Sequence, residues 1–86
     1  MKVELDRQPD AAYFAFSATA SVRQVKMDNA RIIDYAADGS VVGVAFISPS
    51  RGVNLAGVPR AAEIDREARR LGLPIRTALA DVARPG

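Results

Sequence analysis

Hydrophobic and polar residues alternate along the first half of the chain, a pattern typical of strands with one buried and one solvated face. Apolar residues at every second position predict a first strand over residues 2–6. After a break at Pro9, aromatic and small apolar residues predict a second strand over 12–17, with Phe14 and Phe16 sharing its buried face. The chain therefore begins with β-structure.

Three more strands are predicted before residue 48. A third strand is predicted over 21–28, although its apolar residues do not all fall at alternate positions. A bulge near Arg23 and Gln24, which would add one residue and shift the face, is therefore expected. Strands over 31–36 and 41–47 flank an Asp-Gly pair, which is a strong hairpin signal because Gly accepts the positive φ of a tight turn.

The strand over 41–47 is apolar on both of its faces. One face can join the core, and the opposite row contains no charge. That row consists of Val41, Gly43, Ala45 and Ile47. Strands that are apolar on both faces are usually covered on both. Either the chain's own helix or another subunit is expected to cover the outer row.

The second half of the chain predicts one helix. It begins near Pro59, which suits a first helical position, and ends before Gly72, a preferred cap residue. Residues 73–79 suit a short sixth strand, and 80–86 are expected to form a flexible C-terminal tail.

The predicted fold class is α+β. It consists of an antiparallel β-meander of about five strands with one C-terminal helix packed on the sheet, in a single domain over residues 1–79. A chain of 86 residues holds one small core.

Composition excludes most familiar catalytic and metal sites. The chain has no Cys and no His, which removes thiolate nucleophiles, disulfides and the usual metal ligands. We therefore expect no enzyme activity, no catalytic or metal-binding residues and no cofactor.

Charge is nearly balanced, with twelve basic against ten acidic residues. Residues 1–50 hold five basic and six acidic residues, whereas 51–86 hold seven and four. Such a balance disfavours a nucleic-acid ligand. No apolar run approaches the roughly 18 residues of a membrane span, so a cytoplasmic protein without membrane contact is expected.

Two segments carry a resemblance to a known family. Residues 10–16 (DAAYFAF) resemble a D-A-L-Y-hydrophobic strand, and residues 32–35 (IIDY) followed by 38–44 (DGSVVGV) resemble a hydrophobic-D-hydrophobic hairpin ending in G-x-V-V-G-I. In this order, the segments resemble domain-of-unknown-function family 2283, a group of short prokaryotic proteins. The resemblance covers residues 2–48 and extends more weakly through the helix.

This resemblance implies a compact antiparallel sheet that self-associates, with no assigned activity. Similarity to small proteins encoded beside toxin-like proteins further implies an antitoxin-like role. Many relatives carry Glu where this chain has Ala45, so any role that depends on that carboxylate is absent here.

Several polar residues allow a structural and a functional interpretation. Asp34 and Asp38 could form a carboxylate pair, but a solvated strand position for Asp34 and a turn position for Asp38 are favoured. Tyr13 could stack on a base, although it lacks neighbouring cations. The helix arginines alternate with acidic residues, which favours an exposed ion-paired face.

The leading hypothesis is a non-enzymatic interaction module that forms a homodimer through an apolar sheet face. The expected interface residues are Tyr13, Ala15, Val41, Gly43, Ala45 and Ile47. The alternative is an antitoxin-like protein that covers a small co-encoded partner. Its expected partner-binding residues are Arg66, Arg69 and Arg70.

Overall fold

The computed structural model describes residues 1–77, which divide into two compact units. The first unit spans Met1–Ser48 and the second begins at Pro49. The expected single domain over 1–79 stays a prediction, and the tail expected over 80–86 lies outside the described residues.

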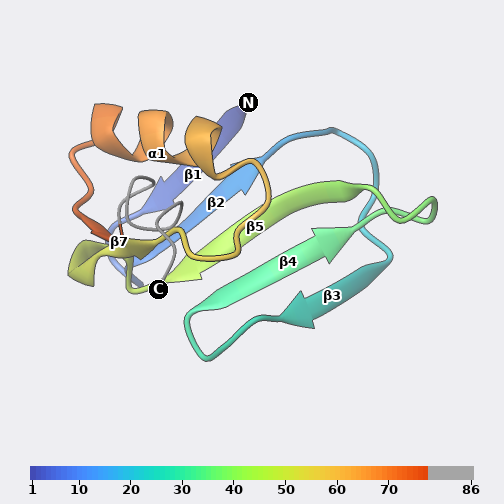
Figure 1. Cartoon of the computed structure of the whole chain (residues 1–86), viewed down its shortest axis with the longest axis horizontal. Helices are drawn as coiled ribbons and strands as arrows, with labels where there is room; N and C mark the ends of the chain where they lie inside the picture. The colour runs from blue at the N-terminus through green and yellow to red at the C-terminus, as the bar shows by residue number, and fades with distance from the viewer. Residues whose placement is uncertain (78–86) are drawn as a thin grey trace. The chain divides into compact units, whose positions relative to one another are not determined.

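The first unit is a five-stranded antiparallel sheet (Figure 1). Its strands are β1 (Lys2–Asp6), β2 (Ala11–Ala15), β3 (Arg23–Lys26), β4 (Arg31–Tyr35) and β5 (Val41–Ile47). They lie in the order β1-β2-β5-β4-β3, so β5 is the central strand. Together with one helix, this sheet confirms the predicted α+β class.

Consecutive strands pair in two groups within the sheet. β3, β4 and β5 form a meander, while β1 and β2 form a hairpin that joins the other edge of β5. The connection over 16–22 therefore runs from β2 to the far edge strand β3.

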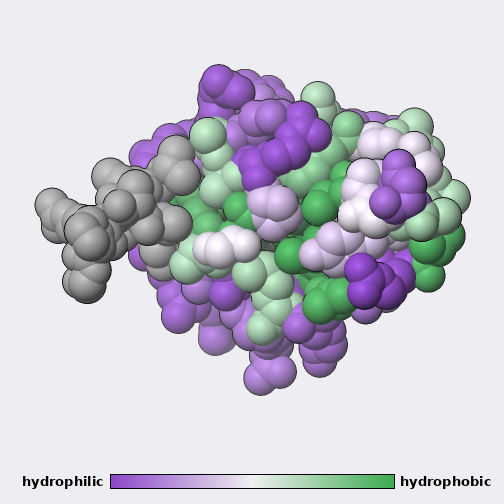
Figure 2. Space-filling model, turned by 45° about the vertical axis from the view of Figure 1, so that its right-hand side comes forward, coloured by the Kyte–Doolittle hydropathy of each residue, from purple (hydrophilic) through white to green (hydrophobic). Residues whose placement is uncertain are grey.

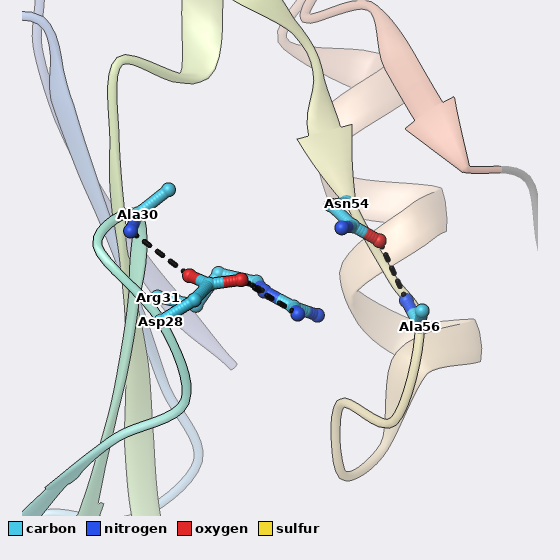
Figure 3. A network of polar contacts seen from close by, with 5 residues as sticks. All are labelled: Asp28, Ala30, Arg31, Asn54 and Ala56. Atoms are coloured by element: carbon cyan, nitrogen blue, oxygen red, sulfur yellow. Dashed lines mark hydrogen bonds and ion pairs between the residues drawn. The ribbon is translucent and has the colours of Figure 1, made fainter.

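Carboxylates hold the two turns of the meander. In the turn before β4, Asp28 Oδ1 accepts a hydrogen bond from Ala30 N at 2.9 Å, and Oδ2 accepts one from Arg31 Nη2 at 2.8 Å (Figure 3). In the turn before β5, Asp38 Oδ1 accepts one from Ser40 N at 2.9 Å, and Gly39 adopts a φ of 88°. The predicted Asp-Gly hairpin is confirmed, with Asp38 in its turn.

The bulge expected near Arg23 and Gln24 is wrong. β3 pairs with β4 in unbroken register, and the irregularity of the sheet lies between Asp34 and Tyr35, opposite β5. Val22, whose position interrupted the alternation of apolar residues, lies outside the strand and is 64% exposed, so no bulge is needed to explain the pattern.

One face of the sheet carries the core of the first unit, and we call it the inner face. Phe14 and Val44 are 0% exposed and Ile33 and Phe46 are nearly so. The rings of Phe14 and Phe46 meet edge to face, with their centroids 5.5 Å apart. Alternation in β2 thus buries Phe14 as the pattern predicted, whereas Phe16 lies beyond the end of the strand and is only half-buried.

The second unit contains a short 3-10 helix (Pro49–Arg51), β6 (Val53–Asn54), α1 (Ala61–Arg70) and β7 (Ile75–Thr77). Ile64 and Ala68, one turn apart on α1, are fully buried. Asn54 Oδ1 accepts a hydrogen bond from Ala56 N at 3.0 Å (Figure 3).

The short strand expected within 73–79 forms, but it pairs in parallel with β6 and does not extend the five-stranded sheet. It begins directly after Pro74, which cannot donate a hydrogen bond to a ladder. Within residues 1–77, no helix has the length and apolar character that a membrane crossing requires.

Some large hydrophobic side chains of the described chain reach the surface. They are Met1, Val22, Val25 and Ile47. The side drawn in Figure 2 shows hydrophobic side chains at the surface among hydrophilic ones. The chain by itself therefore leaves apolar surface open to solvent.

Replacing Phe14 with Ala tests the inner core. Loss of a fully buried ring should reduce the free energy of unfolding by about 3–5 kcal/mol, measured by urea denaturation. The exposed control Val22→Ala should cost less than about 0.5 kcal/mol. A cost below about 1 kcal/mol for Phe14→Ala would contradict the packing described.

Candidate functional site

The face of the sheet opposite Phe14 and Val44 carries the predicted interface, and we call it the outer face. Strand pairing arranges its residues in rows that cross all five strands from β1 to β3. The first row is Glu4, Tyr13, Ala45, Ile32 and Lys26. The second row is Lys2, Ala15, Gly43, Asp34 and Gln24. Both rows therefore have their smallest residues at or beside β5.

The outer face exposes small and apolar side chains on its central strand and charged side chains on its two edge strands. Ala45 is half-buried and Ile47 is 44% exposed, whereas Lys2, Glu4 and Lys26 are exposed on the two edge strands. No salt bridge joins these three charged side chains to another residue in the range 1–77. Their charges are thus available to a second molecule.

A hydrogen bond crosses the centre of this face. Tyr13 Oη on β2 donates to Asp34 Oδ2 on β4 at 2.9 Å, passing over Gly43 on the strand between them. A Cβ atom at residue 43 would lie 2.6 Å from Tyr13 Cζ and 2.8 Å from the Phe14 carbonyl oxygen. Only glycine leaves room for the Tyr13 ring at this position.

Asp34 corrects one expectation from the sequence. It lies on the outer face as its parity indicates, but it is only 8% exposed and so is not solvated. Its Oδ1 is buried and accepts no hydrogen bond from the described part of the chain. Because a buried polar atom without a partner is costly, the bond from Tyr13 is the main local compensation for this carboxylate.

The Tyr13 phenol is held in its protonated form. The pKa of Tyr13 is raised from 10.0 to about 12, chiefly by burial and then by the hydrogen bond to Asp34 and the charges of Asp34 and Glu4. General acid–base catalysis needs a pKa near the working pH. The Tyr13–Asp34 pair is therefore suited to joining strands rather than to moving protons.

The six predicted interface residues divide into contact and support positions. Tyr13, Ala15 and Ala45 lie close together in the two rows, while Ile47 lies in the next row, paired with Ala11. Gly43 is buried beneath Tyr13 and supports the ring. Val41 lies beyond the rows, at the irregularity near Tyr35.

A shallow depression of about 350 Å³ lies beside the first row. Its outer-face lining residues are Glu4, Asp6, Ala11, Tyr13, Ala45 and Ile47. The depression joins the apolar centre of the face to the acidic edge on β1. It extends the predicted interface toward residues that the sequence pattern did not select.

The helix arginines are largely occupied by neighbours on α1. Arg69 forms a salt bridge with Asp65 at 2.8 Å, and Arg70 forms one with Glu67 at 2.7 Å. Arg66 is exposed. Exposed pairs of this kind contribute little to stability, and the assignment of these arginines to a partner stays a prediction.

The sequence pattern did not identify the pairing of Tyr13 with Asp34, nor the common row that Glu4, Ile32 and Lys26 share with Ala45. These residues meet only because β2 and β4 both flank β5. One signal was available, since a glycine inside an otherwise apolar strand often marks the close approach of another group.

The first unit coincides with a match to a known family. Residues 2–48 match the family described as "Protein of unknown function (DUF2283)". The chain belongs to the DUF2283 family. The DUF2283 match ends where the first unit ends, so it contains the whole five-stranded sheet and does not reach α1. No curated protein and no solved structure matches the chain significantly.

The segments that suggested the DUF2283 resemblance meet in the structure. Tyr13 comes from the first segment, and Asp34 and Gly43 come from the two parts of the second; all three lie at the centre of the outer face. This group of residues lies within the matched region.

Replacing Gly43 with Ala tests whether the Tyr13 ring packs directly against residue 43. The added methyl group should reduce the free energy of unfolding by about 1–3 kcal/mol in urea denaturation, because the ring or the strand must move. In a Tyr13→Ala background the same change should cost less, since the crowding ring atoms are absent. Equal costs in the two backgrounds would show that Tyr13 does not occupy this space.

The contribution of Tyr13 to the free energy of unfolding should decrease at alkaline pH. Because the pKa of Tyr13 in the folded chain, about 12, exceeds 10.0, its stabilising contribution is complete below pH 10.0 and is lost as the pH rises through about 12. The difference in unfolding free energy between the unmodified chain and Tyr13→Phe should therefore shrink over this range. A constant difference would contradict the assignment.

Proposed function

We propose that this DUF2283 protein is a non-enzymatic interaction module that pairs with a second copy of itself through the outer face. The observation that supports the proposal most is the apolar centre of this face. Ala15, Ala45 and the half-exposed Ile47 present it without a charged side chain among them. Small residues on a sheet allow a second sheet to approach closely.

The size of the outer face favours a weak and reversible dimer. Five strands about 4.8 Å apart, with about five residues of 3.4 Å each, give a face of about 24 by 17 Å, or about 400 Å² per copy. Stable complexes usually bury about 800 Å² per partner. We therefore expect a micromolar dissociation constant rather than an obligate dimer.

The other functions receive less support. An enzyme is less favoured because the chain has no His, the commonest general base, and no Cys, and because the pKa of Tyr13, about 12, lies far from neutral pH. An antitoxin-like role through the helix would use arginines of which Arg69 and Arg70 already pair with acidic neighbours. A cytoplasmic location remains part of the proposal.

Replacing Ala45 with Lys should dissociate the dimer. The substitution places a charge at the centre of the first row, where two faces would otherwise meet, and should weaken dimerisation at least about tenfold. Sedimentation velocity over a range of concentrations measures the change. The matched control Ala62→Lys adds the same charge at an exposed position of α1 and should leave dimerisation unchanged.

Two outcomes would count against self-association through this face. One is an unmodified chain that stays monomeric up to about 1 mM, well above the expected dissociation constant. The other is a dimer whose dissociation constant responds equally to Ala45→Lys and Ala62→Lys. Circular dichroism of each variant checks that the sheet remains folded.

A further inference from the structure

The first row of the outer face has opposite charges at its two ends. It begins with Glu4 on the edge strand β1, passes through Ala45 on the central strand β5, and ends with Lys26 on the edge strand β3. A rotation by 180° about a line along β5 exchanges β1 with β3 and β2 with β4. The acidic end of the row in one copy therefore lies opposite the basic end of the row in the rotated copy.

We propose that two copies pair about a twofold axis that runs along β5, so that Glu4 of each copy faces the partner's Lys26. This proposal deepens the proposed function, on which it rests. Such an interface is isologous, and each dimer contains the Glu4–Lys26 pair twice. The strands of the two sheets are then nearly aligned, as in common sheet-on-sheet packing.

The rest of the outer face fits this axis. Tyr13 faces the partner's Ile32 across the first row, and Ala45 lies on the axis, where a small side chain permits close approach. In the second row, Lys2 faces the partner's Gln24, which lies next to the acidic Asp34. The first row thus brings acidic and basic edges toward one another, while the second row places Lys2 opposite a neutral amide.

The other simple face-to-face arrangement is disfavoured by charge. A twofold axis in the interface but perpendicular to the strands places β1 over β1 and β3 over β3. When this axis crosses the first row, Glu4 faces the partner's Glu4 and Lys26 faces the partner's Lys26. When it lies between the two rows, Glu4 faces the partner's Lys2, but Lys26 faces only the neutral Gln24. The axis along β5 is preferred because it gives both Glu4 and Lys26 an oppositely charged partner.

A charge-swap experiment in the full chain tests the axis. Glu4→Lys alone and Lys26→Glu alone should each weaken dimerisation about tenfold at low salt, because each creates two repulsive pairs per dimer. The double variant Glu4→Lys with Lys26→Glu should return dimerisation to within about threefold of the unmodified chain. Sedimentation velocity measures all four chains.

Restoration can arise only between copies. Within one chain, Glu4 and Lys26 lie on opposite edges of the sheet, four strand spacings or about 19 Å apart. A double variant as weak as, or weaker than, the single variants would overturn the axis while leaving self-association intact. A chain that is monomeric in all forms would instead overturn the proposed function itself.

Cysteine crosslinking gives a second, independent measurement, because the chain has no cysteine of its own. A mixture of Glu4→Cys and Lys26→Cys chains should form a mixed crosslinked dimer with a short bis-maleimide, whereas either chain alone should crosslink poorly. Efficient crosslinking of Glu4→Cys chains with one another would identify the perpendicular axis and contradict the proposal.

Discussion

The absence of a side chain at residue 43 is the constraint on which the outer face depends. Gly43 leaves the space that the Tyr13 ring occupies, and the ring reaches across the central strand to bind Asp34. This contact joins β2, β5 and β4 on a side of the sheet that contains no fully buried aromatic core. It also provides a hydrogen-bond donor to the buried Asp34 carboxylate at the centre of the face.

The extent of the DUF2283 match separates the two candidate surfaces of the chain. The outer face lies entirely within residues 2–48, the matched region, whereas the arginines of α1 lie outside it. A property common to DUF2283 proteins is thus more reasonably sought on the sheet than on α1. Within this region, the small side chain of Ala45 leaves the middle of the first row without bulk or charge.

Local patterns predicted most of the fold, and non-local pairing explains what they could not predict. Alternation around Phe14 and the Asp-Gly turn at residue 38 depend on neighbours in sequence, and both are confirmed. The strand order depends on which edge of β5 receives the first hairpin, and no local signal determines that choice. For the same reason Asp34 was expected in solvent, because its cover comes from Tyr13, 21 residues away.

The most direct test of the outer face as the self-association surface is a concentration series of methyl NMR spectra on alanine- and isoleucine-labelled protein. As the concentration rises, the signals of Ala15, Ala45 and Ile47 should shift together along one binding curve, while those of Ile33 on the inner face should stay fixed. Outer-face signals that do not change with concentration would contradict the account.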